Sequence, residues 1–512
     1  MDVQRSLTLF LKEFCAANAI REVPSAEILR NRTKNTNVKA DCRIFLRKTQ
    51  LIAFQECMDR LVEQLLHSSA SWPVPVTKCI FCAETSYIEL CLSRAVAFRS
   101  HLKDLLHEPR NERCYGKTAF VYAPYATELS FTSMRTDMLA TYTAACYVNE
   151  GFQTSIHIRD LKNTVFPNRV ANIQHSEQIQ YITEEEASKL LSQCQYYDNL
   201  KGTLNLQEYL QTKGDRAGSG YDGNIGFVSL DGVAFKAAVS MLNIIQGHFK
   251  VLPNVVVHVV PHSKSYTAQN AGLLFEILYS LSFRNDTTAL SQQYLAHNCV
   301  AAQGCDSPET YVALTKSYLK GAFGQRSQTR SAEDLAEAIE ILAKSKLAFD
   351  ILCSKQNMKV VLKQADNYEG KGGLFVQYTS ARISALLSKY DSGVDNGTYP
   401  ALCAIEEVDF SALNSDTEWK LWHSLDCCKH LLENVRLSQN CGKVETHAHK
   451  LCEELITLCL TFGAFYSKVK VLTEPQQHLL RTMMARLWLI KGVHVVLCRM
   501  LESLGLQPLD WM

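Results

Sequence analysis

The stretch Val255-Val-Val-His-Val-Val260 decides the fold class of this 512-residue chain. A short, nearly all-apolar run of this kind is typical of a strand that is buried on both faces of a parallel sheet. Residues 268–281 behind it have helical apolar spacing, as do residues 133–149 behind a second apolar stretch, Lys117-Thr-Ala-Phe-Val-Tyr-Ala123. This alternation of strands and helices predicts an α/β domain over residues 113–330.

The segments on either side of the α/β domain have different patterns. Residues 1–112 combine helical spacing at 7–14 and 51–66 with two apolar strands between positions 74 and 92, which predicts a small α+β domain. Residues 331–512 have helical spacing almost throughout, which predicts a helical bundle, with a flexible connection expected at 391–398. The predicted fold class is therefore α/β plus all-α, in three domains.

The charge composition limits how the chain can meet a polyanion. Its 53 lysines and arginines almost cancel its 52 aspartates and glutamates, so basic groups that meet nucleic acid must be gathered locally. No stretch reaches about 18 uninterrupted apolar residues, and the N-terminus lacks the pattern of an export signal. We therefore expect no membrane partner, reduced cysteines and a cytoplasmic location.

Three segments of the C-terminal third, taken in order, are more specific. They are Phe375-Val-Gln-Tyr-Thr-Ser-Ala-Arg-Ile383, Leu455-Ile-Thr-Leu-Cys-Leu-Thr-Phe-Gly-Ala-Phe-Tyr466, and Ala485-Arg-Leu-Trp-Leu running on to Leu504-Gly-Leu-Gln-Pro-Leu-Asp-Trp-Met512. In order and spacing they resemble the anticodon-binding (DALR) domain of arginyl-tRNA synthetases. That domain has an aromatic-x-Gln-Tyr-Ala-His-Ala-Arg helix, a helix ending in Phe-Tyr, and a terminal Met. The resemblance implies a helical domain that holds the anticodon loop of a tRNA.

The same resemblance implies which side chains meet the loop. In the family, the first aromatic of the Gln-Tyr helix, the alanine four positions on and the terminal Met lie against it; here these positions hold Phe375, Thr379 and Met512. Unpaired bases are bound by stacking on such side chains and by contacts to their edges. For Tyr378 and Arg382 a structural role in orienting the helix stays an open alternative. The full predicted set is Phe375, Gln377, Tyr378, Thr379, Arg382, Trp511 and Met512.

A basic stretch near the N-terminus is the second predicted contact with RNA. Seven lysines and arginines fall between positions 30 and 48, against one acid, Asp41. A solvated face is one interpretation. The other follows from the resemblance, because the family's N-terminal domain touches the tRNA elbow, which implies a phosphate-contacting surface. Its predicted members are Arg30, Arg32, Lys34, Lys39, Arg43, Arg47 and Lys48.

The resemblance continues into the α/β domain, with a departure that bears on activity. Phe120-Val-Tyr-Ala-Pro124 resembles the first strand of the class I synthetase catalytic domain. The family follows this strand with His-x-Gly-His, which closes on the ATP phosphates, whereas the corresponding place here holds Phe131-Thr-Ser-Met134. The second signature, Lys-Met-Ser-Lys-Ser, is also missing. Because this catalysis is electrostatic positioning of phosphates, we expect a degenerate Rossmann domain without catalytic residues or a cofactor.

These features imply a non-catalytic relative of arginyl-tRNA synthetases. The resemblance further implies recognition of arginine tRNAs and their delivery to a partner tRNA methyltransferase of the methyltransferase-like 2 type, which makes 3-methylcytidine in the anticodon loop. Nothing in the sequence itself points to the methyltransferase. Two alternatives stay open: a divergent but active arginyl-tRNA synthetase, and a protein scaffold whose anticodon-binding domain no longer holds RNA.

Two groups of cysteine and histidine residues have spacings that metal sites also use. Cys79-x-x-Cys82 lies in a predicted strand and no second pair follows at the usual interval, so we expect no metal there. A denser group lies between positions 423 and 452, but the family's domain carries no metal, which favours packed or surface residues. Its members are His423, Cys427, Cys428, His430, Cys441, His447, His449 and Cys452.

Overall fold

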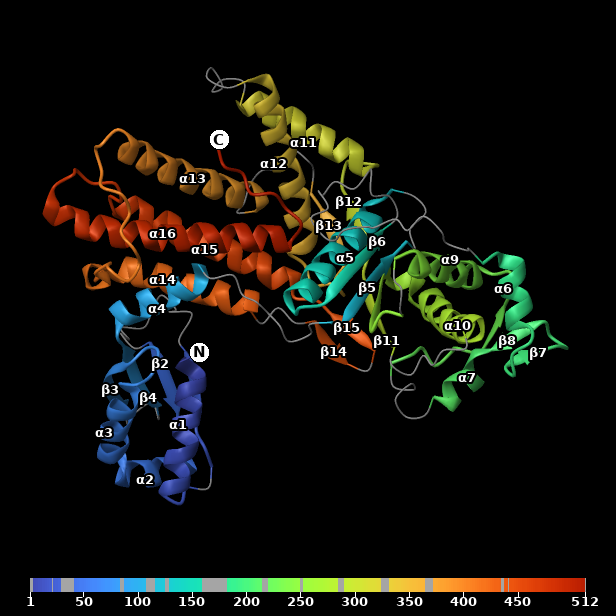
Figure 1. Cartoon of the computed structure of the whole chain (residues 1–512), viewed down its shortest axis with the longest axis horizontal. Helices are drawn as coiled ribbons and strands as arrows, with labels where there is room; N and C mark the ends of the chain where they lie inside the picture. The colour runs from blue at the N-terminus through green and yellow to red at the C-terminus, as the bar shows by residue number, and fades with distance from the viewer. Residues whose placement is uncertain are drawn as a thin grey trace. The chain divides into compact units, whose positions relative to one another are not determined.

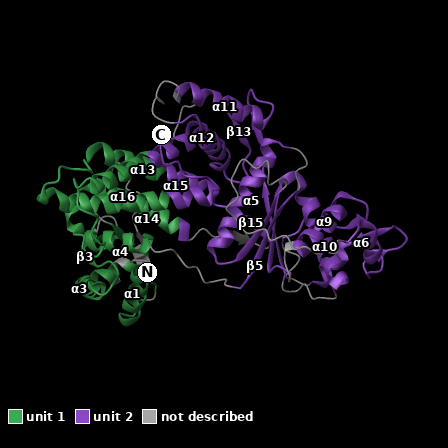
Figure 2. Ribbon diagram, turned by 45° about the horizontal axis from the view of Figure 1, so that its top comes forward, with its two compact units in different colours: residues 1–108, 382–431, 457–497 green, residues 109–381, 432–456, 498–512 purple. Residues whose placement is uncertain are grey.

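The structure of the chain is a computed structural model. It describes residues 3–20, 22–28, 41–82, 87–106, 116–124, 129–158, 182–213, 220–248, 252–283, 290–323, 331–363, 372–433, 437–440 and 442–511. The chain forms two compact units, coloured separately in Figure 2. The first comprises residues 1–108, 382–431 and 457–497, and the second comprises residues 109–381, 432–456 and 498–512. These units cut across the three predicted domains, because the C-terminal segment contributes helices to both.

The second unit is built on a six-stranded sheet with the order β14-β15-β11-β10-β5-β6 (Figure 1). Its strands β6, β5, β10, β11 and β15 are parallel neighbours, and β14 is antiparallel to β15. Their bounds are β5 Thr118–Ala123, β6 Gln153–Ile158, β10 Val255–Pro261, β11 Ser291–His297, β14 Ser438–Asn440 and β15 Lys443–Glu445. The predicted α/β domain with a parallel sheet is thereby confirmed.

Helices cover the sheet on both faces, which explains why residues 255–260 are all buried. On β5 and β10, Phe120, Tyr122 and Val256 share a core with α9 (Val233–His248) and α10 (Ser265–Phe283). Helix α5 (Phe131–Asn149) packs on β5, β6 and β10 from the other face (Figure 1). Alternate side chains of a strand point to opposite faces, so a strand between two helical layers has no polar side.

Further elements surround this layer. A small sheet has the order β7-β8-β9 (Tyr197–Asp198, Thr203–Asn205 and Phe227–Ser229), with α6 (Glu184–Leu191) and α7 (Leu206–Thr212) nearby. Beyond β11, the chain continues through β12 (Val300–Ala302), α11 (Pro308–Phe323), α12 (Ala332–Leu352) and β13 (Val360–Leu362). Ser331 caps α12 by accepting a hydrogen bond from the amide of Asp334, where the sequence predicts the helical part to begin.

The C-terminal segment differs from its prediction in two respects. It is not purely helical, because β13 pairs in parallel with β12 and Lys443 of β15 pairs with Tyr294 of β11. The predicted flexible connection at 391–398 is wrong for its first half, because α13 extends over Gly373–Asp395. That helix ends before Gly397, whose φ of 74° lies in the left-handed region that glycine adopts without strain.

In the first unit, the N-terminal residues form the predicted α+β arrangement. Four antiparallel strands lie in the order β1-β2-β4-β3 (Ser25–Ile28, Cys42–Phe45, Tyr87–Leu92 and Val76–Cys82). The helices are α1 (Val3–Ala17), α2 (Lys48–Glu56), α3 (Met58–Ser69) and α4 (Arg94–Leu106). The segment 51–66, predicted from one helical pattern, divides at Cys57, and Leu61 and Leu65 one turn apart are buried on α3.

The first unit also contains most of the C-terminal helices. These are the later part of α13, α14 (Asp416–Glu433) up to residue 431, α15 (Ala448–Lys468) from residue 457 on, and α16 (Gln477–Ser503) up to residue 497, with a short 3-10 turn at Phe410–Ala412. Leu455, in the part of α15 that belongs to the second unit, and Leu487 of α16 are buried as expected for core residues. Among the described helices, none combines the length and the apolar composition that crossing a membrane requires.

Candidate nucleic-acid interface

Helix α13 carries the first of the three motif segments and begins in close contact with α12. A Cβ at position 373 would lie 2.2 Å from the carbonyl oxygen of Ser345, so only glycine lets the two backbones approach this closely. One side of the following turns is apolar and buried, including Val376 and Ala381. Within residues 373–382, the side chains exposed to solvent are those of Tyr378 and Arg382.

Gln377 does not reach solvent, so in this structure its side chain serves packing, and its direct contact with RNA stays a prediction. Its side chain is fully buried. Its Nε2 donates to Oγ of Ser345 (2.8 Å) and to the carbonyl of Gln507 (2.9 Å), and its Oε1 accepts from the amide of Leu509 (2.8 Å). A buried amide that makes these three bonds has a clear structural task. Gln377 fastens α13 to α12 and to the C-terminal tail.

Thr379 is also turned inward, and its contact with the loop stays a prediction. It is 4% exposed, and its hydroxyl donates to the carbonyl of Phe375 (2.9 Å), one turn earlier on the same helix. The hydroxyl is thus satisfied within α13, a common arrangement for threonine in a helix. Phe375 itself is half-buried, so part of its ring remains available to a ligand.

Tyr378 is the aromatic residue of this segment that is most open to solvent. Its side chain is 47% exposed, whereas its neighbours Gln377 and Thr379 are buried. An exposed aromatic ring on a rigid helix is a suitable platform for an unpaired base, because every base has a face that can stack. Of the two interpretations of Tyr378, its exposure favours binding over packing.

Arg382 follows in the first unit and is exposed as well. Its guanidinium carbon lies 4.2 Å from the centre of the Tyr466 ring on α15, the tyrosine that ends the second motif segment. This cation–π contact orients the guanidinium without neutralising its charge. An oriented arginine is well suited to bind a phosphate through two parallel hydrogen bonds.

The C-terminal tail contributes less than predicted to an exposed surface. Trp511 is half-buried and packs against a core that includes Leu319, Leu342 and Leu509. Part of the Trp511 side chain therefore serves packing within the fold. Met512, the other predicted contact in the tail, lies outside the described residues. Its contact with RNA stays a prediction.

The basic stretch of the N-terminal domain is only partly described. Arg30, Arg32, Lys34 and Lys39 lie outside the described residues, and of Lys48, which begins α2, only the backbone is described. Arg43 does not face solvent as predicted: it pairs with Glu89 at 2.8 Å and stacks 4.1 Å over the Tyr87 ring. Its guanidinium is therefore not open to a phosphate.

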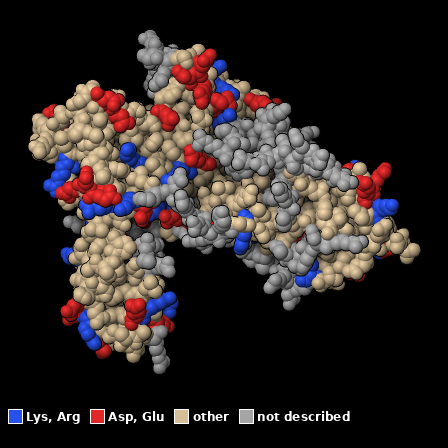
Figure 3. All heavy atoms as spheres, in the orientation of Figure 1, with Lys and Arg blue, Asp and Glu red and all other residues tan. Residues whose placement is uncertain are grey.

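Arg47 is the residue of this stretch whose side chain the structure leaves in solvent. It is 76% exposed and pairs with Glu22 at 3.1 Å, an exposed ion pair that a phosphate can displace at little cost. On the face shown in Figure 3, lysine and arginine side chains are interspersed with acids. That distribution agrees with the near-neutral composition and favours local contacts over a broad basic field.

The N-terminus of α5, at the position where the synthetase signature is expected, is occupied by internal contacts. Phe131 and Met134 are buried. Ser130 caps the helix by accepting from the amide of Ser133 (3.1 Å). Thr132 Oγ1 accepts from the amide of Val300 (3.0 Å). These side chains stabilise the helix start and β12, and none of the residues 131–134 carries an imidazole that stabilises charge on a phosphoryl group.

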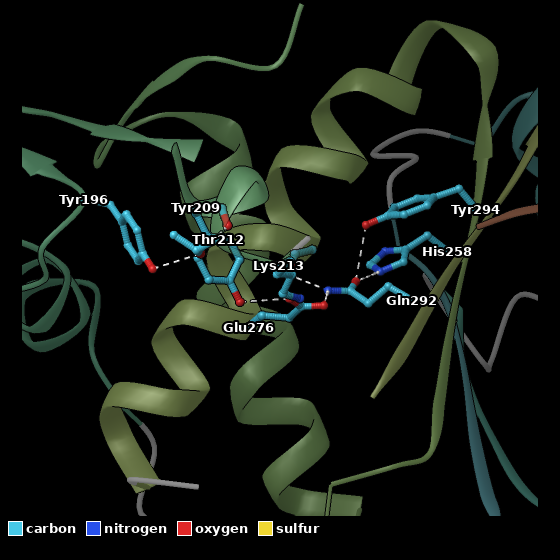
Figure 4. A network of polar contacts seen from close by, with 9 residues as sticks. Tyr196, Tyr209, Thr212, Lys213, His258, Glu276, Gln292 and Tyr294 are labelled. Carbon is cyan, nitrogen blue, oxygen red and sulfur yellow. Dashed lines mark hydrogen bonds and ion pairs between the residues drawn. The ribbon is translucent and has the colours of Figure 1, made fainter. Parts of the chain in front are cut away.

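Polar side chains inside the α/β layer are also engaged with one another (Figure 4). The carboxylate of Glu276, 1% exposed, accepts from Nε2 of Gln292 (2.8 Å) and from the hydroxyl of Tyr209 (3.0 Å), and it pairs with Lys213. Burial lowers the pKa of Lys213 to about 8. Gln292 also accepts from His258, whose pKa is lowered to about 4 by burial, partly opposed by this bond. Each of these polar side chains therefore has a partner within the layer.

Comparison with known families identifies the C-terminal segment. Residues 376–512 match the family described as DALR anticodon binding domain. The C-terminal part of this chain thus matches a DALR anticodon-binding domain, and residues 376–512 are called the DALR domain below. The match begins on α13 one residue after Phe375, and it includes α14, α15 and α16, so the buried Gln377 and the exposed Tyr378 both belong to the DALR domain.

Curated relatives carry the same domain in their names. The chain is 29% identical to the DALR anticodon-binding domain-containing protein 3 of Rattus norvegicus over 50% of this chain and 48% of the relative. It is 26% identical to the protein of that name from Danio rerio, over 60% and 55%. An arginine–tRNA ligase of Saccharolobus solfataricus is 29% identical over 34% and 25%. The chain thus spans about half the length of the curated relatives it matches first.

Solved structures support the fold of the whole chain. The arginyl-tRNA synthetase of Thermus thermophilus has a TM-score of 0.57 with 12% identity, over 100% of both chains. The arginyl-tRNA synthetase of Plasmodium falciparum has a TM-score of 0.58 with 13% identity, over 100% of this chain and 99% of the other. At this identity the similarity shows the fold alone, and it confirms a synthetase-like arrangement with a C-terminal DALR domain.

Sequence reasoning missed the contact between the DALR domain and the N-terminal residues of the first unit. Trp419 and Trp422 of α14 stack with ring centres 4.4 Å apart, and Phe98 of α4 packs edge-on against both. Asp41, counted above as the one acid of a basic stretch, is 2% exposed and accepts from the Trp419 indole (2.7 Å). The i, i+3 spacing of the two tryptophans was a usable signal for a packing face.

The charge of Asp41 is stabilised in this contact. Burial alone would raise the pKa of the carboxyl, but the nearby His423 ring, the amide of Leu92 and the Trp419 indole outweigh burial and hold the pKa below its usual value. The amide of Leu92 donates at 2.8 Å. His423, considered above as part of a metal-like group, thus belongs to a packed interface.

Several of the other cysteine and histidine residues are packed in the part of the chain that the structure describes, whereas Cys441 lies outside it. Burial, together with the nearby Cys91, raises the pKa of the Cys79 thiol to about 12. The side chains of Cys428 on α14 and Cys452 on α15 are buried. Within the described residues, no three histidine, cysteine or acidic side chains converge in a way that could hold a metal ion.

Proposed function

We propose that this protein is a tRNA-binding adaptor that does not itself aminoacylate. In this proposal the DALR domain recognises arginine tRNAs in the cytoplasm. It then presents them to a partner methyltransferase of the methyltransferase-like 2 type, which forms 3-methylcytidine in the anticodon loop. The observation that carries the proposal is on α13, where Tyr378 and Arg382 are left in solvent while Gln377 and Thr379 are used for packing.

The chemistry of these exposed groups suits an anticodon loop. A loop presents unstacked bases and closely spaced phosphates, and stacking on an aromatic side chain contributes about 1–3 kcal/mol per base. Tyr378 offers such a ring, and Arg382, oriented by Tyr466, offers a charge for a phosphate. The names of the relatives, which refer to anticodon binding and to arginine–tRNA ligases, support the choice of arginine tRNAs.

The contacts at the start of α5 support an adaptor over an enzyme. Phe131 and Met134 are buried in the core, and Thr132 and Ser133 are bonded within the fold. Aminoacyl transfer of this class depends on groups that stabilise the charge of the ATP phosphates, and loss of such groups costs orders of magnitude in rate. We expect the partner to supply the chemistry and this chain to supply the identity of the tRNA.

RNA sequencing is the most direct test. The full chain is crosslinked to RNA, purified under stringent washing and sequenced, with Tyr378→Ala as the comparison. Arginine tRNAs enriched over total tRNA with the wild type, and less with the variant, support the proposal. A bound population that matches total tRNA contradicts it and favours a protein scaffold.

Two enzyme assays separate the proposal from an active synthetase. Arginine-dependent exchange of pyrophosphate into ATP should stay at background, and clear turnover would overturn the adaptor. In the second assay, arginine tRNA, S-adenosylmethionine and a methyltransferase-like 2 enzyme are combined with or without this chain. We expect 3-methylcytidine to form only when the chain is present, and equal methylation without it would contradict the role in delivery.

A further inference from the structure

Arg135 on α5 is a buried cation held by backbone carbonyls. Its side chain is fully buried. One terminal nitrogen, Nη1, donates to the carbonyls of Asn298 (3.0 Å) and Met358 (2.8 Å), and the other, Nη2, donates to those of Ser354 (3.4 Å) and Lys355 (2.8 Å). Among the described residues, no carboxylate forms an ion pair with it. Burying an arginine in this way is costly unless its hydrogen bonds are fixed in place.

The four carbonyls belong to two segments that Arg135 holds together. Asn298 directly follows β11 of the central sheet, and residues 354–358 connect α12 to β13. Gln356 in that connection extends the junction to β15: its Nε2 donates to the carbonyl of Val444 (2.9 Å), and its Oε1 accepts from the amide of Thr446 (2.6 Å). This set of bonds, called the junction below, therefore fixes the C-terminal end of α12 to α5, β11 and β15 of the α/β layer.

Arg135 keeps its charge in this setting. Burial lowers the pKa of its guanidinium to about 10, partly opposed by Cys299, so it is still protonated at neutral pH. Carbonyl oxygens carry partial negative charge. The planar guanidinium donates to two carbonyls from each of its terminal nitrogens, which matches the arrangement of these oxygens. No other side chain has this geometry, since a lysine ammonium is a single point with three donors.

Nearer its middle, α12 contacts α13, the helix that carries Phe375 and Tyr378. Seven residues before the end of α12, Ser345 is fully buried and accepts the hydrogen bond from Gln377 of α13. The backbones also touch at Gly373. Gln377 in turn holds the C-terminal tail through Gln507 and Leu509. Helix α12 is thus fixed to the sheet at one end and to α13 at its middle.

We propose that Arg135 is a positioning residue for RNA recognition, which acts through α12 to hold Phe375 and Tyr378 of α13 at a fixed place relative to the α/β layer. The inference rests on the proposed function, since it takes α13 as the RNA-contacting helix. In this proposal the α/β layer supports the RNA-contacting helix α13, a role that requires no catalysis. A tRNA that touches both the layer and α13 then depends on their spacing.

The test compares two RNAs on the full chain. An isolated anticodon stem–loop needs only α13, whereas a whole arginine tRNA also meets the rest of the protein. In Arg135→Met we expect the affinity for whole tRNA to fall by about tenfold, because the junction loses its four donors, while the affinity for the stem–loop stays within about twofold. Arg135→Lys should lie between, because lysine reaches fewer of the carbonyls.

A variant of equal charge controls for general electrostatics. Lys236→Met removes one positive charge from an exposed position on α9 of the same unit, and we expect both RNAs to bind it as they bind the wild type. Equal affinity of Arg135→Met and wild type for whole tRNA would overturn the inference. So would a loss of stem–loop binding as large as that of whole tRNA, since Arg135 would then only keep the unit folded.

A measurement without RNA separates this inference from the proposed function. Hydrogen–deuterium exchange of residues 353–360 should be at least about tenfold faster in Arg135→Lys than in wild type, with a smaller increase over 372–381. Unchanged exchange in both segments would overturn the positioning role of Arg135 even if the chain binds tRNA. Failure of the wild type to bind any tRNA would overturn the proposed function, and the exchange result would still decide whether Arg135 positions α13.

Discussion

The carboxylate of Asp41 accepts a hydrogen bond from the indole nitrogen of Trp419 at 2.7 Å, across 378 positions of sequence. The contact joins the N-terminal residues of the first unit to α14 of its DALR domain. Around it, Arg94 pairs with Asp416 at the surface and Phe98 packs on the tryptophans. A buried charge among aromatic rings makes this contact specific, because few other arrangements satisfy both partners.

Removing Asp41 should destabilise the first unit. Asp41→Ala leaves the Trp419 indole and the Leu92 amide buried without an acceptor, which costs about 1–3 kcal/mol for each group. Adding Trp419→Phe removes one orphaned donor, so the double variant should cost less than the sum of the single variants. Thermal unfolding measures these differences, with Asp416→Ala, which breaks an exposed pair, as a control that costs about 1 kcal/mol or less. Strict additivity would show that the two side chains are not coupled.

The fold was predictable where the pattern is local. The valines of residues 255–260 and the spacing of 133–149 are statements about single elements, and both elements formed as expected. The pairing of Lys443 with Tyr294 was not predictable, because a three-residue strand between helices carries almost no periodic signal. It is fixed by Gln356 and by neighbours that are distant in sequence.

The candidate site was predictable as a segment but not residue by residue. The motif located α13 but does not reveal which side of the helix faces inward. Gln377 is buried because Ser345 and the tail accept its hydrogen bonds, and Tyr378 is exposed because it lies on the other side. Arg43 was expected in solvent because its neighbours are basic, yet Glu89 on the adjacent strand pairs with it. Partners across a sheet cannot be seen in a run of charges.

Tyr378→Ala should weaken tRNA binding more than it weakens the fold. The exposed ring contributes little to packing, whereas loss of one stacked base costs about 1–3 kcal/mol, or about 5- to 150-fold in affinity. Filter binding with an arginine tRNA measures the loss, and Tyr378→Phe, which keeps the ring, should retain most of the affinity. An Ala variant that binds like the wild type would assign Tyr378 to structure alone.

Phe375→Ala should weaken binding without unfolding the domain, to a smaller extent than Tyr378→Ala. Its ring is half-buried, so it offers a ligand less surface than Tyr378 does, and part of its loss falls on packing. Melting temperature and tRNA affinity of the two variants, measured in parallel, decide the order. A larger loss of affinity in Phe375→Ala would make Phe375 the main stacking residue.

Arg382→Ala should change the salt dependence of binding. If the guanidinium contacts one phosphate of an anticodon loop, its loss should reduce the slope of log affinity against log salt by about 0.7–1. Arg382→Lys keeps the charge but loses the planar stacking on Tyr466, so the slope should persist while affinity falls. An unchanged slope in Arg382→Ala would show that the guanidinium stays on Tyr466 and contacts no phosphate.

Acid should weaken the α/β layer through His258. Burial, partly opposed by the bond to Gln292, lowers the pKa of His258 to about 4 in the folded chain, whereas an unfolded histidine titrates near 6.5. Between these values the unfolded chain binds a proton that the folded chain does not. The stabilisation is therefore complete above pH 6.5 and is lost as the pH falls towards 4, by about 1.4 kcal/mol per pH unit. His258→Phe preserves stacking on Tyr294 but cannot titrate, so the free energy of unfolding should fall less steeply with acid in this variant. Denaturant titrations at pH 6.5, 5.5 and 4.5 give the two slopes, and equal slopes would mean that His258 is already protonated in the folded chain.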